Sequence, residues 1–388
     1  MSLPRHRLLS PHPLKNVLPK SSCLPISFRR LNSASPQTHE NQVIFSGIQP
    51  TGVPHIGNYL GALQQWVNLQ STARPSTKLL FSIVDWHAIT KAQDPALLAR
   101  RSRETLATLL AVGIDPERSV VFLQSSVPQH LELYWQLLCT ATTWGGLSRM
   151  TSWKSKIGIP ADSDPLDPIS GKPPMGLFNY PVLQAADILI HRATHVPVGD
   201  DQSQHLELTR QLTTSFNHIY ATTFTPPQTL LSPAKRIMSL TTPLSKMSKS
   251  DHNPLSRILI TSPPAAITLA LKAALTDSLN TITYSPLERP GVSNLLDLYS
   301  YFDPQQRTPA ALAASCRGMG LGALKALVAE AVVEGLAPVR ETYERVVGED
   351  ESSGGAFLRG VRERGGRRAR DSAEETMVGV RRAMGFWR

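Results

Sequence analysis

The sequence predicts an α/β protein in which a parallel sheet is followed by an all-helical C-terminal region. Between Val43 and Asn217, short apolar runs of strand length alternate with segments whose apolar residues recur at helical spacing. Beyond Asp251 the patterns are mainly helical. Because strands and helices that alternate along a chain form a parallel sheet with helices on its faces, the two halves of the chain predict two kinds of domain.

Four short segments predict the strands of the sheet: Val43–Phe45, Lys78–Val84, Ser119–Leu123 and Val196–Gly199. The continuous apolar run K-L-L-F-S-I-V is typical of a strand that is buried on both faces. The helical patterns of the first half are Gly57–Leu69, Pro95 to about Gly113, Leu131–Cys139, Tyr180–Ile190 and Asp201–Asn217. Those of the second half are Ala265–Leu275, Ser293–Phe302, Leu321–Leu336 and a last helix from Ser372.

Local signals support these assignments. Asp94 is a helix-capping residue, and Pro95 stands at the first helical position that proline favours. The stretch Ile157–Gly176 is rich in proline, glycine and aspartate and predicts a long loop.

The N-terminal segment has the composition of an organelle transit peptide. Met1 to His39 carries six lysines and arginines, no acidic residue, and many serines and prolines. A merely disordered basic tail is the other interpretation. Removal of this leader would lower the net charge from +10 to about +4, so the leader's charge says nothing about nucleic acid.

The C-terminal end is a second basic region, with nine arginines against four acidic residues from Arg359 onward. Either an RNA-facing surface or a solvated helix face would explain it. No apolar run approaches the length of a membrane span. The three cysteines show no C-x-x-C spacing, so we infer neither a protein-held metal site nor a disulfide framework.

The first chemistry-bearing stretch is F-S-G-I-Q-P-T-G-V-P-H-I-G-N, which leads from a strand into the start of a helix. The N–H groups and dipole at a helix start attract phosphate, and the glycines allow a close approach. His55 and Asn58 flank Gly57 and can donate to phosphate oxygens without a fixed charge. The P-loop pattern is absent, and an ordinary glycine-rich turn remains the alternative.

The second is K-M-S-K-S, comprising Lys246, Met247, Ser248, Lys249 and Ser250. Two lysines three residues apart on a mobile loop can reach the same triphosphate and stabilise the charge that develops as pyrophosphate leaves. A solvated surface loop would explain any two lysines, but not this pentapeptide about 190 residues after H-I-G-N.

These two stretches resemble the signatures of class I aminoacyl-tRNA synthetases. Further motifs resemble the tryptophanyl-tRNA synthetase family, in its mitochondrial form: V-D-W-H-A-I-T, L-S-R-M-T-S-W-K-S-K, Y-P-V-L-Q-A-A-D-I-L, V-P-V-G-D-D-Q-S-Q-H-L-E-L-T-R and R-P-G-V-S-N-L-L. The resemblance covers nearly all of the chain from Gln42 to about Phe386.

The resemblance implies a fold and a division of the chain. The fold would be a Rossmann-like parallel-sheet catalytic domain with an all-helical C-terminal anticodon-binding domain. Residues 1–40 would be the transit peptide, 41–240 the catalytic domain, 241–255 the mobile lysine loop and 256–388 the helical domain, whose last helix could pack back on the catalytic domain.

The resemblance also implies a tryptophan site. Asp187 would accept the indole N–H, which suits a large apolar substrate with one polar group; a carboxylate that caps a neighbouring loop is the alternative. Phenylalanine would leave Asp187 unpaired and would be rejected strongly. The other implied tryptophan contacts are Phe45, Val196 and Val198 in the pocket wall, Gln184, and Tyr180, Gln202 and Gln49 near the amino and carboxylate groups.

For ATP, the resemblance implies contacts from Gly57, Asn58, Gly199, Asp201 and Gln49 and from the loop residues Lys246, Met247, Ser248 and Lys249. His55, Asn58, Lys156, Lys246 and Lys249 would be catalytic by positioning and electrostatic stabilisation, with Mg²⁺ carried by the ATP. Two departures stand out. Asn58 replaces the last histidine of the class signature, and Gln184 stands where bacterial relatives often have methionine.

The partners implied are tRNA(Trp), ATP and L-tryptophan, with a homodimer, no membrane, and a location in the mitochondrial matrix. Three alternatives stay open. A tyrosyl-tRNA synthetase would share the fold but would need a different polar pair in its pocket. A non-catalytic RNA-binding paralogue predicts eroded phosphate motifs, which are not seen, and a small-molecule nucleotidyltransferase would be shorter.

Overall fold

The fold is known from a computed structural model that describes residues 42–160, 174–199, 202–231, 236–249 and 251–386. The predicted leader, most of the predicted loop 157–176, Asp201 and Ser250 lie outside these ranges.

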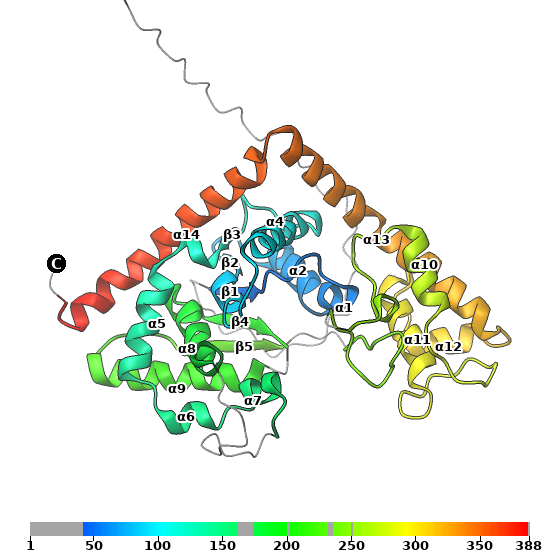
Figure 1. Ribbon diagram of the computed structural model, residues 1–388, viewed down its shortest axis with the longest axis horizontal. Coiled ribbons are helices and arrows are strands. Elements are labelled where there is room, and N and C mark those ends of the chain that lie inside the picture. The colour runs from blue at the N-terminus through cyan, green and yellow to red at the C-terminus, as the bar shows by residue number, and fades with distance from the viewer. Residues whose placement is uncertain (1–41, 161–173, 200–201, 232–235, 250, 387–388) are drawn as a thin grey trace, which may run out of the picture.

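A five-stranded parallel sheet forms the centre of the first half (Figure 1). Its strands are β1 (Val43–Ile48), β2 (Lys78–Ile83), β3 (Val120–Leu123), β4 (His195–Val198) and β5 (Gln228–Leu231). Their order is β3-β2-β1-β4-β5, with every neighbouring pair parallel. The chain order therefore reverses direction between β1 and β4, which is where open α/β sheets bind ligands. The four predicted strands are confirmed, but β5 was missed because only two of its four residues are apolar.

Helices cover both faces of this sheet. They are α1 (Ile56–Asn58), α2 (Gln64–Thr72), α3 (Asp85–Ala88), α4 (Pro95–Ala111), α5 (Gln129–Thr140), α6 (Trp144–Ser148), α7 (Thr151–Ile157), α8 (Met175–Ile190) and α9 (Ser203–Tyr220). A π-helical turn, Tyr59–Leu63, joins α1 to α2. The predicted cap of α4 is confirmed, since the Asp94 carboxylate accepts a 2.7 Å hydrogen bond from the backbone N–H of Leu97.

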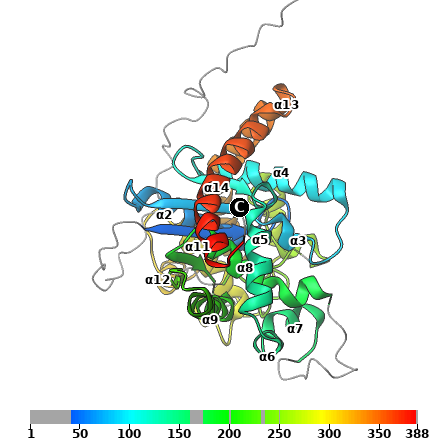
Figure 2. The same ribbon diagram turned by 90° about the vertical axis from the view of Figure 1, so that its left-hand side faces the viewer.

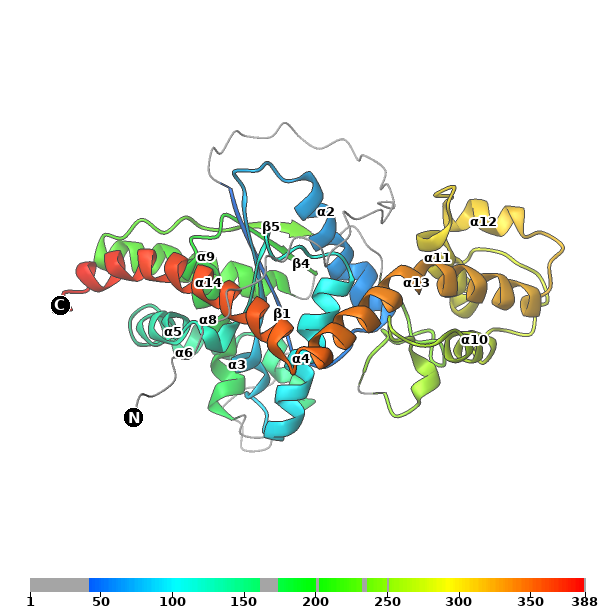
Figure 3. The same cartoon turned by 90° about the horizontal axis from the view of Figure 1, so that it is seen from above.

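The second half is helical, as predicted. It comprises α10 (Pro264–Lys272), α11 (Pro290–Phe302), α12 (Pro309–Ser315), α13 (Leu321–Ser352) and α14 (Ala356–Ala383). Helices α10 to α12 gather at one end of the molecule, and α13 runs from them toward the sheet (Figures 1 and 3). One apolar core continues from the α2–α4 side of the sheet into these helices, and a second lies beneath α5, α8 and α9.

The last two helices form an inverted V over the molecule, and α14 passes across the sheet side of the first half (Figures 1 and 2). Gly354 and Gly355 make the sharp corner with φ angles of 60° and 81°, which favour glycine. Asp350 holds the corner: its buried carboxylate accepts hydrogen bonds from the Leu358 N–H at 2.8 Å and from Arg103 Nε of α4 at 2.7 Å.

The start of the last helix corrects the sequence prediction, since α14 begins at Ala356 and not at Ser372. Two glycines among arginines disfavour a helix by propensity. In the structure these glycines allow α14 to lie close to the edge strand β3. A Cβ on Gly365 would lie 1.7 Å from the carbonyl oxygen of Val121 in β3, and one on Gly366 would lie 3.0 Å from Ser126 Cβ. Tertiary packing against the edge strand therefore overrides local propensity.

This contact yields a prediction about stability. Gly365→Ala should destabilise the protein by about 1–3 kcal/mol, because the backbone of β3 cannot move away from the added methyl group without loss of packing. Gly348→Ala is the matched control, since Gly348 lies in α13 and a methyl group added there would meet no atom within 4 Å. That change should stabilise the helix slightly. Thermal unfolding followed by circular dichroism measures both, and equal midpoints would contradict the predicted contact.

Candidate active site

A cavity of about 1020 Å³ opens at the carboxyl ends of β1 and β4, where the strand order reverses. Most of the site residues inferred from the sequence line it: Phe45, Gln49, His55, Gly57, Asn58, Lys156, Tyr180, Gln184, Asp187, Val196, Val198, Gly199, Gln202 and Lys246. Met247, Ser248 and Lys249 are not among its lining residues. The fold thus brings together residues from five separate stretches of the chain.

One side of the cavity is built to attract anions without a charged histidine. His55 caps α1: its Nδ1 accepts from the backbone N–H groups of Gly57 at 3.1 Å and Asn58 at 3.3 Å. The proton of the neutral ring therefore sits on Nε2, which is left as a donor. Burial lowers the pKa of His55 to about 4, and the charges of Lys249 and Lys246 add to the shift.

The lysine loop is anchored beside this turn. Met247 is buried, and its N–H donates to the carbonyl of Ile237 at 3.1 Å. Lys246 is exposed and lines the cavity. Lys249 takes a different position, because its Nζ donates to the Thr51 and Gly52 carbonyls at 3.0 and 2.9 Å. Lys249 thereby ties the lysine loop to the glycine-rich turn.

Lys156 approaches from α7. Its Nζ lies 3.7 Å from the centre of the Tyr180 ring, a cation–π contact at the cavity wall. Desolvation of the ammonium group lowers the pKa of Lys156 to about 8, and Lys91 adds to the shift, although the side chain as a whole is exposed. The pKa of Lys249 is also lowered to about 8, by burial and then by Arg101.

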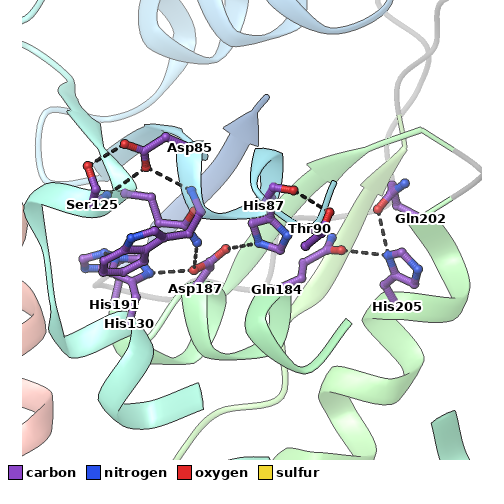
Figure 4. Close-up of polar contacts among 12 residues, drawn as sticks. Asp85, His87, Thr90, Ser125, His130, Gln184, Asp187, His191, Gln202 and His205 are labelled. Carbon is purple, nitrogen blue, oxygen red and sulfur yellow. Dashed lines mark hydrogen bonds and ion pairs between the residues drawn. The ribbon is translucent and has the colours of Figure 1, made fainter. Parts of the chain in front are cut away.

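The other side of the cavity holds a buried carboxylate. Asp187 of α8 is only 2% exposed, and three side chains donate to it (Figure 4). Its Oδ1 accepts from Gln124 Nε2 at 2.7 Å and from His130 Nδ1 at 2.7 Å, and its Oδ2 accepts from His87 Nε2 at 2.8 Å. Burial by itself would raise the pKa of Asp187, but the hydrogen bonds from His130 and His87 lower it to about 2. The group is therefore an anion at neutral pH.

Counting acceptor sites shows what this carboxylate can still do. A carboxylate has about four lone-pair sites, two on each oxygen. Both sites of Oδ1 and one site of Oδ2 are used by Gln124, His130 and His87. One acceptor site remains on Oδ2. Asp187 and His87 line the cavity, whereas Gln124 and His130 do not, so the free site belongs to the cavity side. Asp187 can accept one more N–H or O–H from a bound molecule.

A second buried polar group organises another part of the cavity wall. His205 of α9 is fully buried, and its Nδ1 lies 2.7 Å from Gln184 Oε1 and 2.9 Å from Gln202 Oε1 (Figure 4). Its Nε2 lies 3.2 Å from Tyr180 Oη and 2.7 Å from Ser152 Oγ. His205 therefore fixes the three side chains that the sequence assigned to the substrate.

Sequence reasoning did not assign His87, Gln124, His130, His191 or His205. A usable signal existed for part of this set. His87 follows the end of β2 and Gln124 follows β3 directly, at the edge where the carboxyl ends of parallel strands meet. No comparable signal marks His130, since one buried histidine in an amphipathic helix has no spacing that points to a distant aspartate.

Fold and cavity together define a nucleotide-binding α/β protein. A helix start and lysines provide an anion side, and a buried carboxylate in apolar walls provides a side for a bulky group with one N–H. Within the described ranges, no cluster of three or more histidine, cysteine or acidic side chains is placed to hold a metal ion. Among the helices described, none combines the length and apolarity that crossing a membrane requires.

Comparison with known proteins gives the family. The profile described as "tRNA synthetases class I (W and Y)" matches residues 37–337. The chain is 44% identical over 364 residues to the mitochondrial tryptophan–tRNA ligase of Saccharomyces cerevisiae, covering 92% of this chain and 94% of the relative. It is 41% identical to the tryptophan–tRNA ligase of Wolinella succinogenes, covering 88% of this chain and 98% of the relative.

Comparison with solved structures leads to the same family. Tryptophanyl-tRNA synthetase from Mycoplasma pneumoniae matches with a TM-score of 0.74 and 30% identity, over 89% of this chain and 98% of its own. The Campylobacter jejuni enzyme in complex with ADP and tryptophan matches with a TM-score of 0.71 and 31% identity, over 89% of this chain and 100% of its own. The chain belongs to the class I tRNA synthetases and, within that class, to the tryptophan–tRNA ligase family.

The lysine pKa values yield a prediction. As the pH rises through about 8, Lys156 and Lys249 should lose their protons, so the positive charge around the anion side falls between pH 7 and 9. Lysines labelled with ¹³C-methyl groups and followed by NMR should include two that titrate near pH 8. Lys156→Arg should remove one of these signals and Lys249→Arg the other. Titration of both only above pH 10 would contradict the desolvation argument.

Proposed function

We propose that the protein attaches L-tryptophan to tRNA(Trp) through a tryptophanyl-adenylate, with release of pyrophosphate and then AMP. The observation that carries the proposal is the single acceptor site left on the buried Asp187 carboxylate. Indole is a large apolar group with one N–H donor, so it matches that site in number and in chemistry. The relatives named above are tryptophan–tRNA ligases, and one neighbour was solved with ADP and tryptophan.

The amino-acid half of the cavity supports specific contacts. The indole would lie between Phe45, Val196 and Val198, with its N–H on Asp187. Tyr180 and Gln202, both held by His205, would bind the α-amino group. The amide oxygen of Gln184 faces His205, so the glutamine that stands here in place of the bacterial methionine binds that histidine. The indole ring would then be contacted by apolar side chains.

The nucleotide half would hold ATP. The α-phosphate would lie at the start of α1, near Gln49, Gly57, Asn58 and the Nε2 donor of His55. Gly199 and Asp201 would contact the ribose and adenosine. The tryptophan carboxylate attacks the α-phosphorus, the bond to the bridging oxygen breaks, and pyrophosphate leaves as its Mg²⁺ complex. Lys156, Lys246 and Lys249 would stabilise the leaving phosphates, with Met247 and Ser248 placing the loop. The Mg²⁺ would arrive with the nucleotide.

The remainder of the chain suits this role. We assign residues 41–240 to the catalytic domain, 241–255 to the lysine loop and 256–388 to tRNA anticodon binding, with α14 returning to the catalytic domain. The basic leader at 1–40, which has no acidic residue from Met1 to His39, is suited to import, and two relatives are mitochondrial. We therefore place the enzyme in the mitochondrial matrix, where it would serve mitochondrial translation.

The deciding test is amino-acid-dependent ATP–pyrophosphate exchange, with the chain started at Gln42. Tryptophan should support exchange. Phenylalanine should not, because its ring offers no donor to Asp187, and tyrosine should not, because its one hydroxyl is carried by a ring smaller than the indole that we assign to this cavity. Asp187→Ala should lower kcat/KM for tryptophan by at least about 100-fold, since it removes the polar contact on which selectivity depends. Exchange with tyrosine alone would preserve the chemistry but overturn the pocket assignment. No exchange with any amino acid would reject the synthetase function.

We also propose a homodimer, on the strength of large apolar side chains exposed on α5, α6 and α8. Trp135 is 64% exposed, Met175 65%, Trp144 53% and Leu131 40%. Exposed aromatic and methionine side chains are typical of protein–protein interfaces. Sedimentation of the chain at micromolar concentration should give the mass of a dimer, and Trp135→Asp should shift it toward monomer. A wild-type protein that sediments as a monomer would refute this proposal.

A further inference from the structure

A continuous series of hydrogen bonds connects the buried carboxylate of the cavity with the C-terminal helix. Asp187 Oδ1 is 2.7 Å from His130 Nδ1. His130 Nε2 is 3.2 Å from His191 Nε2, and His191 Nδ1 is 3.2 Å from Ser372 Oγ. The series starts in the cavity, passes through α5 and the residue that follows α8, and ends on α14.

One arrangement of protons satisfies every hydrogen bond in this series. The Asp187 carboxylate can only accept, so His130 Nδ1 carries a proton. Burial keeps the pKa of His191 well below its ordinary value, so His191 is neutral and has one N–H. When His130 carries its proton on Nδ1 alone, its Nε2 accepts from His191 Nε2–H, and His191 Nδ1 accepts from the Ser372 hydroxyl. One tautomer of each ring satisfies every bond, and all donors point toward Asp187.

The surroundings make these bonds strong. His130 is fully buried and His191 is 3% exposed. The two rings lie 5.1 Å apart, and Phe122 contacts both, at 5.9 Å and 5.5 Å between ring centres. Phe45, which lines the cavity, stacks on His191 at 5.8 Å. Water is therefore kept away from the rings, and hydrogen bonds in series polarise one another in such a medium.

We propose that His130, His191 and Ser372 are positioning residues for tryptophan: they hold the Asp187 carboxylate so that its one free acceptor site faces the indole N–H. Because Ser372 lies on α14, the docking of that helix becomes part of amino-acid selection. This inference rests on the proposed function. The mechanism there uses neither histidine, so their effect on the substrate passes through Asp187.

The test needs a probe that differs from tryptophan only at the N–H. Benzothienylalanine has that property, because sulfur replaces the indole N–H in a ring of nearly the same shape. The measured quantity is the ratio of kcat/KM for tryptophan to kcat/KM for benzothienylalanine in ATP–pyrophosphate exchange. A general loss of folded enzyme lowers both values equally and leaves the ratio unchanged.

The expected results follow the order of the series. His130→Leu should reduce the ratio by about tenfold or more, because it removes a hydrogen bond to a charged group. Ser372→Ala should reduce it by about threefold, since the bond it removes is between neutral groups. Ser352→Ala is the matched control: this serine is exposed at the end of α13, donates to the Glu349 carbonyl of its own helix, and should leave the ratio unchanged.

A conservative variant separates the local bond from the series. His130→Asn keeps an N–H close to the position of Nδ1 but loses the link to His191, so its ratio should fall between those of wild type and His130→Leu. A wild-type ratio in this variant would show that the local donor suffices, which would overturn the role of His191 and Ser372. Unchanged ratios in both His130→Leu and Ser372→Ala would overturn the whole inference. Failure of the wild-type enzyme to use tryptophan would instead reject the proposed function.

Discussion

The buried negative charge of Asp187 is the constraint around which the catalytic half is arranged. An ionised carboxylate inside a protein costs several kcal/mol unless donors surround it. Its three donors come from three different elements: His87 from α3, Gln124 from the end of β3, and His130 from α5. Those elements must therefore meet at α8 in one arrangement. The contacts that pair the charge therefore also shape the pocket.

The anion side of the cavity combines a neutral buried histidine with lysines, instead of a buried charge held by fixed donors. His55 is kept neutral by burial and by nearby lysines, and its ring caps α1 at the cavity. Positive charge is supplied by lysines with long side chains, which could follow the charge of bound phosphates as it changes. In the proposed reaction, rigid neutral donors would position the α-phosphate, and movable lysines would stabilise the leaving group.

The sequence predicted most of the strands and cavity residues, and the elements that it did not predict were missed for physical reasons. Buried parallel strands such as K-L-L-F-S-I-V are continuous apolar runs, so β1 to β4 were evident, whereas the short β5 is half polar. The motif residues lining the cavity could be inferred because the short motifs that carry them resemble those of a known family. The partners of Asp187 could not, because His130 lies 57 positions away and the pairing is created only by the fold. The start of α14 could not be predicted either, because glycine disfavours a helix by propensity and only the fold brings Gly365 against the carbonyl of Val121.

Selectivity in this site must depend on polar contacts, because size alone cannot provide it. A pocket large enough for indole also admits the smaller rings of phenylalanine and tyrosine, and lost apolar contact discriminates by only about 1–3 kcal/mol. A ligand with no donor for the buried carboxylate is rejected more strongly, because it leaves a charged acceptor unpaired. That rejection requires the carboxylate to stay in place when the wrong ligand binds. Three donors hold Asp187. One of them, His130, is hydrogen-bonded to His191, which in turn is hydrogen-bonded to Ser372 on α14, so the carboxylate is fixed in one position. Rigidity behind the carboxylate is therefore what converts one hydrogen bond into specificity.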